Sequence, residues 1–389
     1  MESIMQRLTH LFFILMIILV SSANASFHPL LDSDLNDLSV YANGTITMAD
    51  GVITHGNMQA LTTITLAANG QVGGNIEAGS TATLSGNVIV NGYIEASTTA
   101  TLGANVNVIG KVQTGTTATF GAGVYVKGNI EAGSTVTLEQ NAEVMGNVVA
   151  GSTVTIAAGS YIHQNVDAGT TATIADNVII SGGPATSNSS KAPPPAPVVT
   201  SKENQITTVQ AELKALVTDQ ELDWDDFGDN DESLVAGVYN SVNYLTIAAG
   251  KTLTLDGNGM DGSWVFNIAN NLSFGIDSKV VLLNVTDNSS ILWNVLGEST
   301  AGLTSLGAGA EVRGHILSKG AIDGGAISLV TGIGDSCGGV FSATSTVTFA
   351  ASSIIGYQGC GAVDVPEPAT IWLLGLGLDI VITVNRKQG

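Results

Sequence analysis

A repeat of 18 residues runs through the first half of this 389-residue chain. A pair of threonines separated by one residue recurs at this interval in each of eight copies. A fixed period of this length is typical of solenoids, in which each repeat forms one coil and neighbouring coils bury each other's apolar faces. The same interval separates Gly56, Gly74, Gly92, Gly110, Gly128 and Gly146.

A second period of six residues lies inside each copy, as in Ile76, Ala82 and Val88. Each of these residues has another apolar residue two positions later, for example Ala78 after Ile76. Such alternation indicates short strands with one buried face. Three strands per copy, joined by Gly, Asn and Ser corners, predict a three-sided β-helix over residues 38–183. The spacing leaves its handedness open.

The eight copies differ in what they place on the outer surface. The outward residues of the first and third strands vary in size and polarity from copy to copy, whereas the second strand always presents Thr-x-Thr. One face of the predicted coil stack is therefore held constant. Its residues are Thr45, Thr47, Thr63, Thr65, Thr81, Thr83, Thr99, Thr101, Thr117, Thr119, Thr135, Thr137, Thr153, Thr155, Thr171 and Thr173.

Stacked coils would arrange these threonines in two columns. Neighbours on one strand would lie ~6.6–6.8 Å apart and neighbours on successive coils ~4.7–4.9 Å apart. Threonine is stiff at χ1, so the face should be rigid, and it carries no charge. Hydroxyls can anchor ordered water while methyls enclose it, so we predict an ice-binding face. The alternative is that threonine is used as a good strand former that stabilises the sheet.

The acidic balance of the chain limits its partners. It has 33 acidic and 12 basic residues, a net charge of −21, so it should repel nucleic acid. No catalytic motif or metal-ligand pair occurs, and the repeats contain only the basic residues Lys111 and Lys127. We therefore expect no enzyme, no cofactor and no metal. The acidic stretch 223–232 lacks EF-hand spacing and is interpreted as a solvated loop.

The N-terminal residues 1–25 have the pattern of a secretory signal peptide. A basic residue precedes a short apolar run, which is followed by a small-residue cleavage site. Export would place the two cysteines of the chain in an oxidising compartment. Cys337 and Cys360 are therefore a disulfide candidate, and two free buried thiols are the alternative.

A Ser/Pro-rich stretch at residues 184–203 is predicted to be a linker. A helix is expected over residues 204–218, with one apolar face formed by Ile206, Val209, Leu213, Leu216 and Val217.

Four segments after this helix carry a resemblance to a known family. They are residues 234–239, 264–268, 291–295 and 314–318, and they contain the sequences LVAGVY, WVFNI, ILWNV and GHILS. Region 204–362 resembles the bacterial and fungal ice-binding proteins, which are discontinuous β-solenoids. The resemblance implies a second, irregular β-solenoid with a packed α-helix and an ice-binding activity. Ala236 and Leu292 depart from the usual proline and phenylalanine of these segments.

Two further resemblances concern the array and the tail. The 18-residue repeats loosely resemble the bactofilin-type β-helix. Residues 363–389 combine Pro366, Glu367 and Pro368 with an apolar run and terminal basic residues, and they resemble the PEP-CTERM sorting signal. This signal implies exosortase-type sorting in a Gram-negative bacterium, with the tail holding the protein at the membrane transiently.

The sequence thus predicts an all-β protein in which a regular β-solenoid precedes a second, irregular one. The leading hypothesis is an exported, cell-surface or secreted ice-binding protein whose partners are ice and the sorting machinery. The alternative is a structural or adhesive matrix protein that self-associates or binds matrix polysaccharide.

Overall fold

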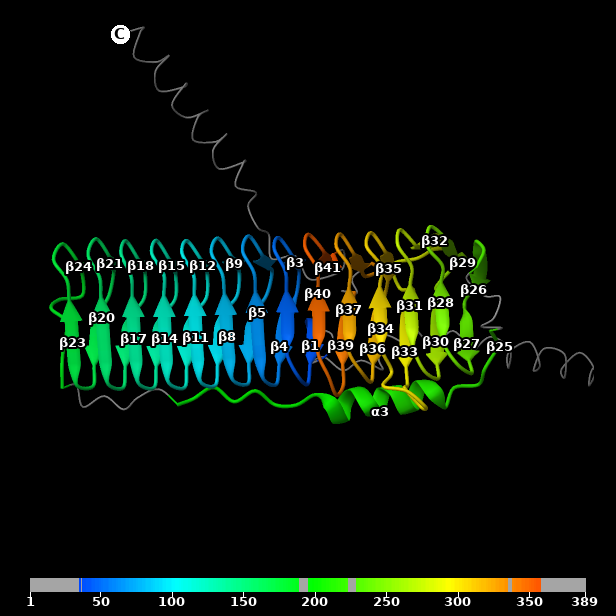
Figure 1. Cartoon of the computed structure of the whole chain (residues 1–389), viewed down its shortest axis with the longest axis horizontal. Helices are drawn as coiled ribbons and strands as arrows, with labels where there is room; N and C mark the ends of the chain where they lie inside the picture. The colour runs from blue at the N-terminus through cyan, green and yellow to red at the C-terminus, as the bar shows by residue number, and fades with distance from the viewer. Residues whose placement is uncertain (1–34, 36, 189–194, 223–228, 335–337, 358–389) are drawn as a thin grey trace, which may run out of the picture.

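The computed structural model describes residue 35 and residues 37–188, 195–222, 229–334 and 338–357. These residues form one continuous β-solenoid with three long parallel sheets, and helix α3 (Glu203–Lys214) lies along its side (Figure 1). The predicted all-β solenoid with one packed helix is confirmed. We call the sheets A, B and C, in the order in which each coil visits them.

Sheet A has 14 strands, which in sequence order are β1 (Leu38–Ala42), β4 (Asn57–Ala60), β7 (Ile76–Ala78), β10 (Ile94–Ala96), β13 (Val112–Thr114), β16 (Ile130–Ala132), β19 (Val148–Ala150), β22 (Val166–Ala168), β25 (Gln220–Glu221), β27 (Gly237–Ser241), β30 (Ser263–Ile268), β33 (Ser290–Val295), β36 (His315–Ser318) and β39 (Gly339–Ser342).

Sheet B has 13 strands, which are β2 (Ile46–Met48), β5 (Thr63–Leu66), β8 (Thr81–Leu84), β11 (Thr99–Leu102), β14 (Thr117–Phe120), β17 (Thr135–Leu138), β20 (Thr153–Ile156), β23 (Thr171–Ile174), β28 (Leu245–Ile247), β31 (Leu272–Phe274), β34 (Thr304–Leu306), β37 (Ile322–Gly324) and β40 (Val347–Phe349).

Sheet C has 14 strands, which are β3 (Ile53–Thr54), β6 (Gln71–Val72), β9 (Ile89–Val90), β12 (Asn107–Val108), β15 (Tyr125–Val126), β18 (Glu143–Val144), β21 (Tyr161–Ile162), β24 (Ile179–Ile180), β26 (Glu232–Val235), β29 (Thr252–Met260), β32 (Lys279–Val285), β35 (Glu311–Arg313), β38 (Leu329–Thr331) and β41 (Ile354–Tyr357).

The chain enters this solenoid in its middle. Strands β1, β2 and β3 of the first coil pair in parallel with β39, β40 and β41 of the last. From that junction the 18-residue repeats extend in one direction to β22, β23 and β24, and the chain then returns to build the other half. Figure 1 shows the repeats to the left of the junction and the second half to the right. The two predicted solenoid segments therefore share all three sheets.

The interior is a continuous apolar core made by the inward residue of each strand. On sheet B the residue between the two threonines is fully buried in each inner coil, as at Ile64, Ala82 and Val136. Each coil covers the core of its neighbour, which accounts for the constant aliphatic positions in the repeat.

A left-handed residue turns the chain between sheets B and C in every repeat. The backbone φ angle is near +60° to +76° at these positions, where only Gly and Asn are readily tolerated. The positions recur at the repeat interval, and they are Gly51, Asn69, Asn87, Asn105, Gly123, Asn141, Gly159 and Asn177. In the second half Ile327 adopts the same conformation, with a φ of 60°.

Helix α3 packs on sheet A of the second half. Its buried residues Ile206, Val209 and Leu213 join a separate apolar cluster with Leu292 and Leu317. The helix ends at Lys214 rather than at residue 218 as predicted.

The prediction that the helix continues to residue 218 with Val217 on its apolar face was wrong, because Val217 is 86% exposed. Beyond Ala215 the chain leaves the helix to join sheet A, where the backbone N–H of Asp219 donates to the carbonyl of Val238 at 2.8 Å. Pairing with the sheet replaces the last helical turn.

Candidate functional site: the threonine face

The three faces of the array differ in what covers them, and sheet A is covered by the linker. The returning segment 195–202 follows the outer surface of this sheet (Figure 1). Side chains of sheet A and its adjoining turn donate to its backbone, and the bonds are Gln113 Nε2 to Pro195 O at 2.9 Å, Ser97 Oγ to Pro197 O at 2.7 Å and Gln59 Nε2 to Thr200 O at 2.6 Å.

This docking buries outward residues on the first strands of several repeats. Tyr41 is fully buried, and Gln59 and Gln113 are 4% and 9% exposed. The phenol oxygen of Tyr41 accepts a hydrogen bond from the backbone N–H of Lys202 at 2.9 Å. The linker and α3 together occupy much of sheet A.

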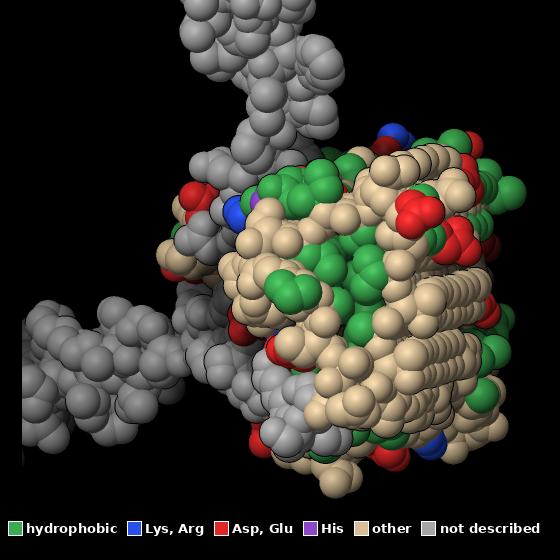
Figure 2. Space-filling model, turned by 90° about the vertical axis from the view of Figure 1, so that its left-hand side faces the viewer, with side chains coloured by type: hydrophobic (Ala, Val, Ile, Leu, Met, Phe, Trp, Pro, Cys, Tyr) green, Lys and Arg blue, Asp and Glu red, His purple; other side chains and the backbone are tan. Residues whose placement is uncertain are grey.

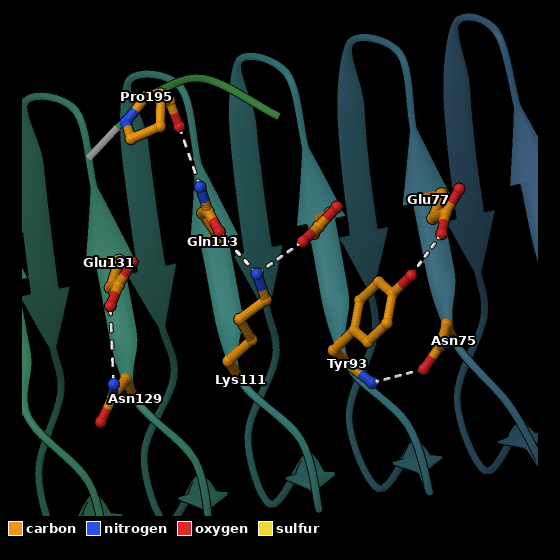
Figure 3. Close-up of polar contacts among 9 residues, drawn as sticks. Asn75, Glu77, Tyr93, Lys111, Gln113, Asn129, Glu131 and Pro195 are labelled. Atoms are coloured by element: carbon orange, nitrogen blue, oxygen red, sulfur yellow. Dashed lines mark hydrogen bonds and ion pairs between the residues drawn. The ribbon is translucent and has the colours of Figure 1, made fainter. Parts of the chain in front are cut away.

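The carboxylates of sheet A are engaged by neighbouring side chains. The Tyr93 hydroxyl donates to Glu77 at 2.5 Å, and Lys111 lies 2.7 Å from both Glu95 and Gln113 (Figure 3). Burial, the hydrogen bond to Glu77 and the charges of Glu77 and Glu95 raise the pKa of Tyr93. Within the described part of the chain, no group of three His, Cys, Asp or Glu residues is arranged to hold a metal ion.

Sheet C of the array is open but has no constant chemistry. Its outward positions include Gln71, Ile89, Tyr125 and Glu143 in different coils. The Glu143 carboxylate contacts the His163 ring nitrogen at 3.0 Å. A surface of such mixed character does not present one repeated pattern to a ligand.

Sheet B presents the predicted threonine columns in register. Thr99 pairs with Thr81 and Thr117, and Thr101 pairs with Thr83 and Thr119. The same pairing continues coil by coil from β5 to β23. We call this surface the threonine face. It consists of the sixteen threonines predicted from the repeats.

The hydroxyls of the threonine face are largely unused by the protein. Among the described residues, the only hydrogen bond to a hydroxyl of this face joins Thr81 and Ser80, at 3.5 Å. These hydroxyls are therefore available to water.

A neighbouring column of hydroxyls behaves differently. At the corner between sheets A and B, the hydroxyl of Thr98 donates to the Ser80 carbonyl of the preceding coil at 2.8 Å. Thr116 donates in the same way to the carbonyl of Thr98 at 2.8 Å. This corner column holds coils together, which is the role that the alternative interpretation gave to the Thr-x-Thr columns.

One row of outward residues on sheet B continues past the junction, and this continuation was not predicted from the sequence. In register with Thr47 the outward residues of the second half are Thr348, Asp323, Ser305, Ser273 and Thr246. Each stands between two inward residues, as Thr348 does between Val347 and Phe349, and this alternation is the signal that could have identified them. With strands ~4.8 Å apart, the 13 strands of sheet B span about 58 Å.

Several predicted features lie outside the described residues. They are the signal peptide 1–25, most of the acidic stretch, the candidate disulfide Cys337–Cys360 and the sorting motif Pro366, Glu367 and Pro368. In the part of the chain that is described, no helix has the length and apolarity needed to cross a membrane.

Comparison with family models gives two matches, and the first of them begins within the last repeats of the array. The Ice-binding-like family model matches residues 159–355, about half of the chain, and the PEP-CTERM protein-sorting motif matches residues 364–383. The latter motif indicates export and sorting to the cell surface. No curated protein sequence matches the chain significantly.

Solved structures that align with this chain include three ice-binding proteins. One from the Antarctic ascomycete Antarctomyces psychrotrophicus is 13% identical, with a TM-score of 0.40, over 83% of this chain and 95% of that one. One from an Antarctic biological consortium is 12% identical, with a TM-score of 0.41, over 83% and 88%. One from an Arctic yeast is 20% identical, with a TM-score of 0.33, over 59% and 92%. On the strength of the family match, this chain belongs to the Ice-binding-like family and carries a PEP-CTERM sorting motif.

Proposed function

We propose that this protein is an exported ice-binding protein of a Gram-negative bacterium, and that the threonine face is the surface that meets ice. Membership of the Ice-binding-like family supports the activity. The PEP-CTERM motif supports action at the cell surface or outside the cell.

The choice of face rests on one observation, which is the difference between the two hydroxyl columns. Hydroxyls at the corner bond to carbonyls of the preceding coil, whereas those of Thr99, Thr101 and their equivalents make almost no bond to the protein. A threonine that only stabilised the sheet would not need to leave its hydroxyl unpaired at nearly every coil. The pattern therefore favours bound water as the partner of these groups.

Charge and accessibility support the same face. The sixteen threonines of the repeats carry no ionisable group, so water ordered above them is not reoriented by a charge within these columns; Asp323 lies in the continuation of one column beyond the junction. Linker and helix cover much of sheet A. Sheet C is open but chemically irregular. Sheet B is the open face with a single repeated chemistry.

The experiment is ice-recrystallisation inhibition by the mature chain and two triple variants. Thr99→Lys, Thr117→Lys and Thr135→Lys place three charged, longer side chains in the threonine face, and we expect most activity to be lost. The matched control changes outward residues of sheet C, namely Gln71→Lys, Ile89→Lys and Tyr125→Lys, and should retain activity. Circular dichroism checks that both variants are folded.

Two results would contradict the proposal at different levels. Full activity of the threonine variant would exclude the threonine face of these coils while leaving ice binding intact. A parent protein that neither inhibits recrystallisation nor shapes ice crystals would exclude ice binding itself. Filaments formed by such an inactive protein would support the structural or adhesive role instead.

A further inference from the structure

The solenoid ends in an incompletely covered coil at β22, β23 and β24. Viewed end-on, apolar side chains fill the centre of this surface (Figure 2). In the preceding coil the equivalent core residues Ile156 and Ile162 are 1% and 0% exposed. In the last coil Ile174 and Ile180 are only partly buried, although they point into the same core.

The backbone of this coil is also incompletely paired. In the preceding coil the carbonyls of Ile156 and Ile162 accept hydrogen bonds of 2.9 Å from the N–H groups of Ala175 and Ser181. Across the residues that the structure places, no donor reaches the equivalent carbonyls of Ile174 and Ile180. Strands β23 and β24 are the terminal strands of sheets B and C. Unpaired strand edges of this kind are templates for pairing with another chain.

The segment after the last coil covers only one side. Thr186 pairs with β22, accepting from the N–H of Ala168 at 3.0 Å and donating its own N–H to Val166 at 2.9 Å. This segment, at Gly183, Pro184, Ala185 and Ser187, then borders an open hollow of ≈ 640 Å³ whose remaining lining is Ala172, Ile174, Val178 and Ile180 of the last coil. Among the described residues, sheet A is thus covered at this end, while sheets B and C have no cover.

The array itself shows what fits such a surface. Every inner coil is covered by another 18-residue coil in register, as β20 is covered by β23 and β21 by β24. The opposite end of the solenoid does not offer this match, because Leu245 there pairs with Leu272 across a longer coil. The same coil of a second copy matches the exposed coil in size and outline, although its strands would pair antiparallel rather than parallel as in the array.

We propose that two copies of this protein associate end to end through their last coils, burying Ile174, Ile180 and their neighbours. A contact between identical surfaces is related by a two-fold axis, so strands of the two copies run antiparallel across it. Such a contact occupies the same end of both copies and leaves no matching end for a third, so the assembly stops at a dimer. The end of one coil is a small surface, so we expect dissociation constants on the order of micromolar. This inference does not depend on ice binding.

The test is sedimentation velocity of the full mature chain over a concentration series from about 1 to 100 µM, a range set by the expected affinity. The parent should shift from monomer to dimer, with no larger species. Ala175→Glu adds a charge at the rim of the last coil without entering its core, and it should weaken the dimer at least about tenfold, with recovery in high salt. Ala157→Glu, at the same position one coil earlier, is the matched control and should dimerise like the parent.

A second variant tests the apolar centre. Ile174→Glu should abolish dimerisation. Because this change can also loosen the last coil, the Ala175→Glu variant decides the question if the two variants give different results. A parent that remains monomeric at 100 µM would overturn the proposal. So would a dimer that Ala175→Glu and Ala157→Glu leave equally strong, or a series of ever longer oligomers.

Discussion

Thr47 and Thr348 are register partners on the neighbouring strands β2 and β40, although they lie near opposite ends of the described chain. Their pairing joins the 18-residue repeats to the second half through sheet B, and sheets A and C make the same connection. The two halves therefore have one core and should unfold together.

This coupling can be measured at the junction. Ile46 is fully buried and pairs with Val347 of the second half, so Ile46→Ala should lower the free energy of unfolding by about 2–5 kcal/mol. Trp264 and Trp293 report on the second half by fluorescence, while circular dichroism reports on all strands. The two transitions should shift together. A fluorescence transition that stays in place would show that the halves unfold independently.

The corner residue Ile327 is predicted to be strained. It holds a φ of 60° and is 68% exposed, at a turn where the repeats use Asn or Gly. A left-handed conformation costs most residues roughly 1–2 kcal/mol, and more for a β-branched one, so Ile327→Asn should stabilise the protein by about 1 kcal/mol. The reciprocal change Asn105→Ile should destabilise it. Urea denaturation measures both, and a destabilised Ile327→Asn would contradict the explanation.

Helix docking depends on Gln210. Its side-chain Nε2 donates to the backbone carbonyls of Val295 and Leu317 at 3.1 and 3.0 Å. The backbone carbonyl of Gln210 accepts a hydrogen bond from Asn294 Nδ2 at 2.9 Å. Gln210→Leu removes both side-chain donations, and we expect a loss of about 1–3 kcal/mol in thermal or chemical unfolding. Glu212→Gln, on the exposed side of the helix, serves as the control. Equal stability of the two variants would show that these bonds do not anchor the helix.

We expect that the docked linker can be released from sheet A without lowering the stability of the core. Ser97→Ala with Gln113→Ala removes two of the bonds to the linker backbone but leaves the buried apolar residues intact. Limited proteolysis within residues 195–200 should become faster, with little change in the melting temperature. Thr101→Ala with Thr119→Ala on sheet B is the control. Unchanged cleavage would mean that other contacts hold the linker.

Alkaline pH should destabilise the fold through Tyr93. Its pKa is raised by burial and by Glu77, so the folded state keeps the proton where the unfolded chain has lost it. Stability from this group is complete below the unfolded pKa of about 10 and falls as the pH rises above it. Tyr93→Phe should therefore lose less stability than the parent between pH 9 and pH 11. Urea midpoints at these pH values measure the difference, and equal losses would exclude Tyr93.

The repeat pattern predicted the coils and the threonine face because both depend on local alternation and on an interval visible within the chain. The left-handed corners were equally visible, since Asn69, Asn87 and Asn105 recur with the same period. The junction could not be predicted, because many similar strands could pair with the first strand of the array, and the sequence does not specify that Val40 pairs with Val340. The buried state of Gln59 and Gln113 was also hidden, since it depends on where the linker lies.

The return path of the linker ties the length of the array to the length of a separate segment. Each added or deleted repeat moves the end of the array by ~4.8 Å, and an extended Pro-rich chain covers ~3.1 Å per residue. A change of one 18-residue unit must therefore be matched by about one or two residues between the last coil and α3. Natural variants of this architecture should gain and lose repeats only together with such compensating changes. The number of residues in the linker should therefore increase with the number of coils in the array.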